Sequence, residues 1–152
     1  MSETSATGTE RASTKSGPLS SSWVVAEVRV RYAETDQMGV AYYSNYLVWF
    51  EVGRAELCRQ RGLPYQAFEK NTGLALAVAE AHCRYHSPAL YDEVLIIRTR
   101  VQALRKRMIV FEYEVLKQGS ELLVATGSTS HVVIDKNGRP RSFPPEYVRF
   151  YQ

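Results

Sequence analysis

Residues 33–51 read AETDQMGVAYYSNYLVWFE and place one acid and one glycine ahead of a tyrosine pair and a run of bulky apolar residues. A carboxylate such as Asp36 can attack a carbonyl carbon or activate water for that attack. The free N–H groups at the start of a following helix would hold the oxygen as negative charge develops. Gly39 lets the loop turn sharply and lets a substrate approach the backbone. The chemistry that needs this pairing is acyl transfer.

A second interpretation of Asp36 is structural. An acid just before a helix often caps the preceding turn or the helix start with its side chain. Spacing alone leaves both interpretations open.

A long helix must follow this loop. Ser44 can cap its start, and Gly62 followed by Pro64 would end it through a left-handed glycine stop. The first half, Tyr46 to Phe50, is apolar on every side, and polar residues return only after Glu51. Such a helix has to be surrounded, either by a sheet that curves around it or by a second subunit.

The remaining elements are mostly strands with the alternating pattern of half-buried sheet. The first is expected within Trp23–Tyr32, and a turn of helix is expected at Tyr65–Glu69. Four further strands are expected at Leu74–Tyr85, Glu93–Ala103, Met108–Lys117 and Glu121–Ile134. Short links between the last strands force antiparallel neighbours. One strand, one long helix and four strands predict an α+β fold with helix and sheet packed as two layers.

Composition limits the class of protein. Met1–Ser22 is rich in Ser and Thr and predicts a disordered tail, so residues 23–152 are expected to form a single domain. Nothing in the sequence is long and apolar enough to span a membrane, and the cytoplasm is the expected compartment. A net charge of +3 is too small to indicate nucleic acid binding. Cys58 and Cys83 lack metal or disulfide spacing and are expected to be small buried hydrophobes.

The loop and helix start also carry a recognisable motif. Its residues are Tyr32, Glu34, Thr35, Asp36, Gly39, Tyr42, Tyr43, Tyr46, Phe50 and Glu51. This pattern resembles the 4-hydroxybenzoyl-CoA thioesterase family, and the resemblance covers the chain from Trp23 to about Val148. It continues through Arg84-Tyr85-His86-Ser87-Pro88-Ala89, His131-Val132-Val133-Ile134-Asp135, Arg139-Pro140-Arg141 and Pro144.

The resemblance implies a hotdog fold, in which a five-stranded antiparallel sheet wraps around one long central helix. It implies a homodimer or homotetramer whose sheets join edge to edge, and hydrolysis of an acyl-CoA with no separate cofactor. Asp36 matches the family's catalytic aspartate, which acts as nucleophile or general base. Tyr43 matches the position whose backbone N–H polarises the thioester carbonyl. Many relatives have histidine there, so any help from such a side chain is missing or altered in this chain.

Substrate-binding residues are less sharply indicated. Tyr42 and Tyr46 could line an acyl pocket, whereas Phe50 is expected in the core. A basic turn is formed by Arg105, Lys106 and Arg107, with Arg139 and Arg141 as further candidates. This turn either holds coenzyme A phosphates or is simply solvated, and the sequence favours neither.

Three other polar residues are expected to have ordinary roles. Glu51 is expected to pair locally with Arg54 rather than act as a second catalytic carboxylate. His82 and His86 share a strand face without a third ligand, so no metal is expected.

Two other functions remain open. The thiol carrier could be an acyl carrier protein, or the chain could bind acyl-CoA without hydrolysing it. A hotdog dehydratase is disfavoured because those enzymes use a histidine near the helix, and no histidine occurs before His82.

Overall fold

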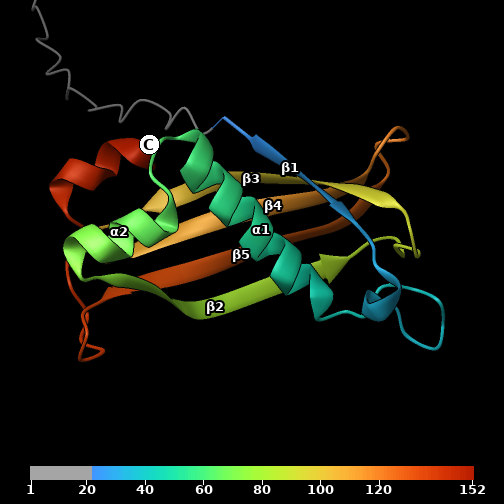
Figure 1. Ribbon diagram of the computed structural model, residues 1–152, viewed down its shortest axis with the longest axis horizontal. Helices are drawn as coiled ribbons and strands as arrows, with labels where there is room; N and C mark the ends of the chain where they lie inside the picture. The colour runs from blue at the N-terminus through green and yellow to red at the C-terminus, as the bar shows by residue number, and fades with distance from the viewer. Residues whose placement is uncertain (1–21) are drawn as a thin grey trace, which may run out of the picture.

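The computed structural model describes residues 22–152, so the expected tail lies outside the described residues except for Ser22. Figure 1 shows one face of a five-stranded sheet covered by one long helix. The strands are β1 (Val24–Arg29), β2 (Ala75–Tyr85), β3 (Val94–Leu104), β4 (Met108–Lys117) and β5 (Leu123–Ile134). The helices are α1 (Asn45–Gln60) and α2 (Tyr65–Thr72), with 3₁₀ turns η1 (Tyr32–Glu34) and η2 (Pro145–Phe150).

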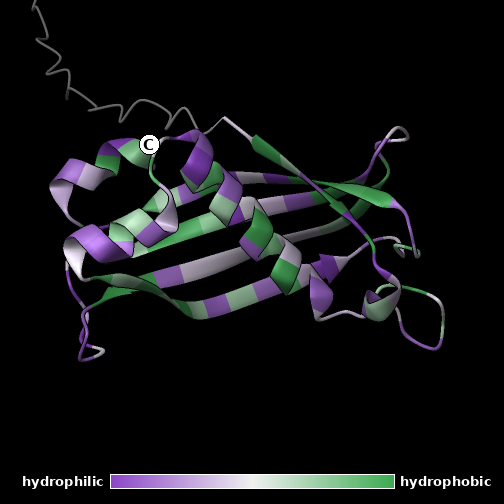
Figure 2. Cartoon of the chain, in the orientation of Figure 1, coloured by the Kyte–Doolittle hydropathy of each residue, from purple (hydrophilic) through white to green (hydrophobic). Residues whose placement is uncertain are grey.

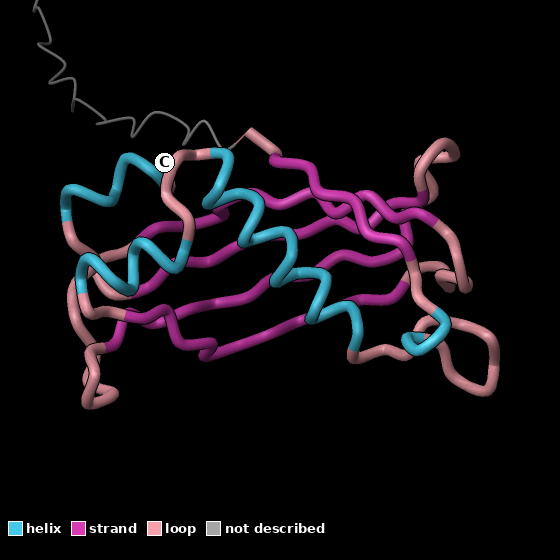
Figure 3. The backbone as a smooth tube through the Cα atoms, in the orientation of Figure 1, coloured by secondary structure: helices cyan, strands magenta, loops and turns pink. Residues whose placement is uncertain are grey.

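The sheet has the order β1-β3-β4-β5-β2, and every pairing is antiparallel. The backbone trace in Figure 3 shows α1 running obliquely across the strands. The predicted α+β class, with an antiparallel five-stranded sheet around one long helix, is confirmed. The helix α1 crosses the sheet from the β2 edge, where Tyr46 packs on Tyr85, to the β1 edge, where Gln60 Nε2 donates to the Val25 carbonyl.

Some element boundaries differ from the predictions. The first strand ends at Arg29 rather than Tyr32, because the chain turns at η1, where the Glu34 carboxylate accepts the Arg31 N–H at 2.8 Å. The expected turn at Tyr65–Glu69 is a longer helix, α2. The η2 turn was not predicted.

Of the two predicted ends of α1, the glycine stop is confirmed and the serine cap is not. Gly62 adopts the left-handed conformation (φ +83°), which confirms the glycine stop. Ser44 occupies the N-cap position, but its side chain makes no capping hydrogen bond. The expected cap is therefore wrong, because Ser44 has helical rather than extended backbone angles (φ −72°, ψ −21°) and enters α1 from a turn.

The core lies between α1 and the sheet. Figure 2 shows hydrophobic and hydrophilic residues alternating along the strands, as expected for a sheet with one buried face. Tyr46, Trp49 and Phe50 of α1 are buried, and the Phe50 ring stacks on Tyr113 of β4 with centroids 4.2 Å apart. The expectation that Phe50 belongs to the core is confirmed.

Two glycines allow α1 to approach the sheet closely. A methyl group on Gly53 of α1 would overlap Thr99 Oγ1 on β3. A methyl group on Gly127 of β5 would lie 2.5 Å from the Phe50 ring. Side chains at these positions would push α1 away from the strands, so the glycines fix the depth at which the helix packs.

One side of α1 and one edge of the sheet stay uncovered. Leu47, Val48 and Val52 of α1 are 41%, 51% and 38% exposed. Among residues 22–152, β2 pairs only with β5, so its other edge has no strand partner there, and Val78 of β2 is 57% exposed. The sheet alone therefore does not surround α1.

The close contact at Gly53 gives a stability prediction. Gly53→Ala should destabilise the fold by roughly 1–2 kcal/mol, because overpacking against Thr99 exceeds the helix-propensity gain of about 1 kcal/mol. In a Thr99→Ala background the same change should become neutral or stabilising, since the overlapping hydroxyl, which has no hydrogen-bond partner among residues 22–152, is gone. Urea unfolding of the four proteins measures the cycle. An equal cost in both backgrounds would show that Thr99 does not set the helix depth.

Candidate active site

A surface depression of about 400 Å³ lies where the 36–42 loop, the start of α1 and the end of β2 meet. Its lining comprises Asp36, Val40, Ala41, Tyr42, Tyr43, Tyr46, Tyr85, His86, Ser87 and Pro88. The structure thus brings together Asp36, Tyr42, Tyr43 and Tyr46, four of the residues singled out in the sequence. Gly39 stands in the same loop with φ +76°, and no atom lies within 4 Å of the position that a side chain would occupy.

The loop holds Asp36 in a tight turn. Its Oδ1 accepts the Met38 N–H at 2.8 Å, and its backbone N–H donates to the Val40 carbonyl at 2.9 Å. The carboxylate therefore caps its own loop and not α1. Oδ2 accepts no hydrogen bond from residues 22–152, so one oxygen of a half-buried carboxylate remains available to a ligand.

The start of α1 supplies free donors beside this carboxylate. The backbone N–H groups of Tyr43 and Ser44 have no acceptor among the residues that the structure describes. They stand at the positive end of the α1 dipole, where an anionic oxygen is stabilised. The depression thus combines an acceptor carboxylate with unpaired N–H donors.

The tyrosines form the walls. The Tyr85 hydroxyl donates to the Tyr43 carbonyl at 2.8 Å, which ties the end of β2 to the start of α1. The Tyr46 and Tyr85 rings meet edge to face with centroids 4.9 Å apart. Burial raises the pKa of both phenols, so they keep their protons at neutral pH.

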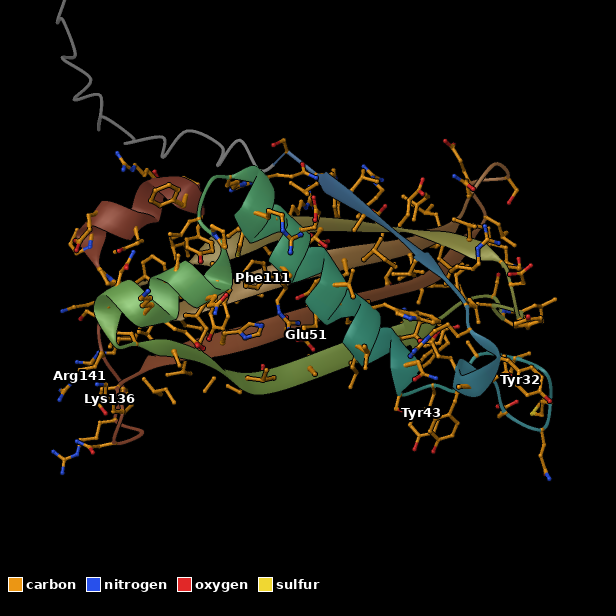
Figure 4. All side chains as sticks on the ribbon, viewed as in Figure 1. Tyr32, Tyr43, Glu51, Phe111, Lys136 and Arg141 are labelled. Carbon is orange, nitrogen blue, oxygen red and sulfur yellow. The ribbon has the colours of Figure 1, made fainter. Side chains whose placement is uncertain are left out.

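The basic residues lie elsewhere in the chain. Arg105, Lys106, Arg107, Lys136, Arg139 and Arg141 form what we call the basic cluster, all of them exposed. Hydrogen bonds from the Phe143 N–H to the Lys106 carbonyl (2.7 Å) and from the Val133 N–H to the Arg107 carbonyl (3.0 Å) hold its two segments together. Figure 4 shows Lys136 and Arg141 at the opposite end of the molecule from Tyr43. Within one chain, the structure therefore does not bring Arg105, Lys106 and Arg107 to Asp36.

A second cavity, of about 150 Å³, lies between α1, α2 and the sheet. Figure 4 shows Glu51 on α1 and Phe111 on the sheet behind it, two of its lining residues. His131 lines it too, and a chain of hydrogen bonds leads from there to α1. His131 Nε2 lies 2.8 Å from Thr129 Oγ1, the Thr129 and Tyr113 hydroxyls are 2.5 Å apart, and Arg54 Nη1 donates to the Tyr113 hydroxyl at 3.1 Å.

Other polar expectations can be compared with the structure. Glu51 makes no ion pair with Arg54 among the described residues, so the expected local pair is wrong; Arg54 donates to the Tyr113 hydroxyl, and both residues line the second cavity. His82 approaches Glu80 at 3.9 Å, and His86 lies 3.0 Å from Thr126 Oγ1.

Two further observations concern metal ligands and membrane helices. No cluster of three His, Cys, Asp or Glu side chains suited to a metal occurs within residues 22–152. In the same range no helix is long and apolar enough to cross a membrane. Cys58 is buried and Cys83 is partly buried, and both are free thiols.

Three residues near the two cavities were not singled out as site residues. Glu34 and Tyr85 belong to the motif segments, but no pattern in the sequence indicates a role for either residue. His131 is a buried histidine in a strand, which the period of the strand could indicate by placing it on the inward face.

We compared the chain with families and proteins of known sequence. The family model of the thioesterase-like superfamily matches residues 30–150. The acyl-CoA thioesterase YbgC of Haemophilus influenzae is 32% identical over 119 residues, which cover 78% of this chain and 87% of that protein.

Solved structures show the same fold. The DHNA-CoA thioesterase of Staphylococcus aureus has a TM-score of 0.80 and 31% identity, covering 85% of this chain and 88% of the other. A 4-hydroxybenzoyl-CoA thioesterase mutant complexed with 4-hydroxybenzoyl-CoA has a TM-score of 0.78 at 20% identity, covering 86% and 99%. The second likeness concerns the fold alone.

The buried histidine predicts a pH-dependent stability. Burial, with the nearby Arg54 charge, lowers the His131 pKa from 6.5 to about 4. Between these values the unfolded chain binds a proton that the folded chain does not, so stability should fall as pH drops from 6.5 to 4, by about 3 kcal/mol in total. Urea unfolding at several pH values should show this slope reduced in His131→Leu but kept in a His86→Leu control at an exposed histidine. An unchanged slope in His131→Leu would contradict the assignment.

Proposed function

The chain belongs to the thioesterase-like superfamily, and we propose that it is an acyl-CoA thioesterase that hydrolyses an acyl-CoA to the free acid and coenzyme A. One observation carries the proposal: Asp36, whose Oδ2 accepts no hydrogen bond from residues 22–152, and Tyr43, whose N–H has no acceptor among them, line one depression. The names of relatives such as YbgC and the DHNA-CoA thioesterase support coenzyme A as the thiol carrier. Nothing in the described residues favours an acyl carrier protein or binding without hydrolysis.

In the reaction, the thioester carbonyl oxygen accepts a hydrogen bond from the Tyr43 N–H. Asp36 either takes a proton from water as the water oxygen attacks the carbonyl carbon, or attacks that carbon itself to form an anhydride that water then opens. The tetrahedral oxyanion is stabilised by a hydrogen bond from the Tyr43 N–H and by the α1 dipole. Its collapse breaks the carbon–sulfur bond. The departing thiolate takes the proton held by Asp36 when Asp36 acts as the base, or a proton from solvent when Asp36 is the nucleophile.

The active form is proposed to be at least a homodimer. A second copy that pairs its β2 antiparallel with the open β2 edge would extend the sheet and satisfy its unpaired backbone groups. It would also cover Leu47, Val48 and Val52, the exposed apolar residues of α1. This arrangement supplies the enclosure that the apolar start of the helix requires.

The proposed dimer would also bring the basic cluster of one copy close to the depression of the other copy. β2 runs from the basic-cluster end of the sheet at Ala75 to the Asp36 end at Tyr85. Antiparallel pairing about a two-fold axis therefore sets the basic cluster of one copy beside the depression of the other. Arg105, Lys106 and Arg107 would then hold coenzyme A phosphates in trans, with Arg139 and Arg141 beside them.

The catalytic role of Asp36 gives the first activity prediction. Asp36→Asn should lower kcat by roughly 100-fold or more, since the amide can neither attack nor take a proton. Thiol release from a panel of short, long and aromatic acyl-CoAs measures it, with Glu146→Gln, an exposed acid in η2, as the control. Full turnover by Asp36→Asn on every thioester would exclude Asp36 as the catalyst.

The basic cluster predicts a carrier-dependent change in KM. The double variant Arg107→Ala/Arg139→Ala should raise KM for an acyl-CoA about tenfold or more, because two charge-assisted contacts to phosphate are lost. The same acyl group on pantetheine, which carries no phosphate, should keep its KM. Arg149→Ala in η2 serves as the control, and equal effects on both substrates would contradict phosphate binding.

Mixed dimers test whether the cluster acts in trans. One copy carries Asp36→Asn and the other carries Arg107→Ala/Arg139→Ala, so the intact Asp36 and the intact cluster are in different chains. The proposal predicts half of the wild-type kcat with a wild-type KM for acyl-CoA. A raised KM would place the phosphate contacts in the same chain as Asp36.

A further inference from the structure

Glu34 is a buried carboxylate two residues before Asp36. The residue is only 6% exposed, and both of its carboxylate oxygens accept hydrogen bonds. Oε1 accepts the Arg31 N–H at 2.8 Å and Arg31 Nε at 3.2 Å, and Oε2 accepts the indole N–H of Trp49 at 3.0 Å. Burial by itself would raise the pKa of this carboxyl, but the hydrogen bonds from Arg31 and Trp49 outweigh it and lower the pKa.

The backbone of Glu34 makes two more contacts. Its carbonyl accepts the Tyr42 N–H and Asn45 Nδ2, each at 2.8 Å. Glu34 therefore contacts the returning end of the loop at Tyr42 and the first two turns of α1 at Asn45 and Trp49. Asp36 follows Glu34 by two residues, and Tyr43 follows Tyr42 by one residue.

Burying a carboxylate costs free energy compared with burying an apolar side chain of the same size. An apolar side chain of similar volume often stabilises a fold at least as well, because burying charge carries a desolvation cost. The hydrogen bonds of Glu34 connect the segment before Asp36 to the start of α1, the two segments that carry the groups proposed to react. An apolar side chain could not make these connections.

We propose that Glu34 is a positioning residue that fixes the distance between the Asp36 carboxylate and the Tyr43 N–H. The inference rests on the proposed thioesterase function. Its side chain joins the segment before Asp36 to Trp49 of α1, and its carbonyl joins that segment to Tyr42. Reacting groups must be held within about 0.5 Å, and a 1 Å displacement can cost about 100-fold in rate, so the loss of one such link should appear in kcat.

Glu34→Gln tests the side-chain link. The amide keeps the volume but presents an NH₂ group to either Arg31 or Trp49, both of which are donors. We expect kcat to fall roughly 10- to 100-fold with KM within about twofold of wild type. Trp49→Phe, which removes only one of the three hydrogen bonds, should cause a smaller fall, and Glu34→Asp should recover part of the activity because it keeps the charge.

A purely structural role would behave differently. It would lower the melting temperature while kcat per folded molecule, measured well below that temperature, stayed at the wild-type value. Phe68→Leu in α2 serves as the matched control, because Phe68 is fully buried away from the loop and its truncation should reduce stability without changing kcat. If Glu34→Gln does not fold, Glu34→Asp and Trp49→Phe carry the same comparison.

The effect must also pass through Asp36. Glu34→Gln should cost little further kcat in an Asp36→Asn background, since the group that it positions is already lost. Turnover retained by Asp36→Asn alone would overturn the proposed mechanism. Loss of turnover in Asp36→Asn, with wild-type kcat in Glu34→Gln, Glu34→Asp and Trp49→Phe, would overturn the positioning role alone.

Discussion

The close packing of α1 on the sheet is the constraint on which the rest of the structure depends. A side chain at Gly53 would overlap Thr99 Oγ1, and one at Gly127 would lie 2.5 Å from the Phe50 ring, which stacks on Tyr113; these two glycines therefore let α1 pack tightly on the strands. Because overpacking or separation here would cost stability, the helix has one depth and one oblique path. That path begins at the edge strand β2, where Tyr46 packs on Tyr85, so the first turn of α1 meets the end of β2 and the loop that follows β1.

The proposed reacting groups lie where the start of α1, the end of β2 and the loop after β1 come together. The 36–40 loop is closed by its own hydrogen bonds, and within the described part of the chain one Asp36 oxygen and the Tyr43 N–H are left without a partner. The Glu34 side chain and carbonyl connect these two segments, while the Tyr85 hydroxyl holds Tyr43 from the other side. Hydrogen bonds from the neighbouring backbone and side chains thus hold the two segments that carry the Asp36 carboxylate and the Tyr43 N–H.

Short-range features were predictable from the sequence, and long-range ones were not. The strands, the Gly62 stop and the single long helix follow from local periodicity and backbone preference. The nearness of Asp36 to Tyr43 follows from their separation of seven residues. The burial of Glu34 depends on Trp49, fifteen residues away, and periodicity assigns an acid to the surface. The Ser44 cap failed because a preceding turn, not the side-chain type, sets the backbone at the helix start.

The central claim, that Asp36 and the Tyr43 N–H converge on one thioester carbonyl, can be seen directly in a crystal structure. The Asp36→Asn variant soaked with an intact acyl-CoA should show the carbonyl oxygen about 2.9 Å from the Tyr43 nitrogen. The carbonyl carbon should face the substituted side chain. A carbonyl bound outside this depression, or turned away from the Tyr43 N–H, would contradict the account.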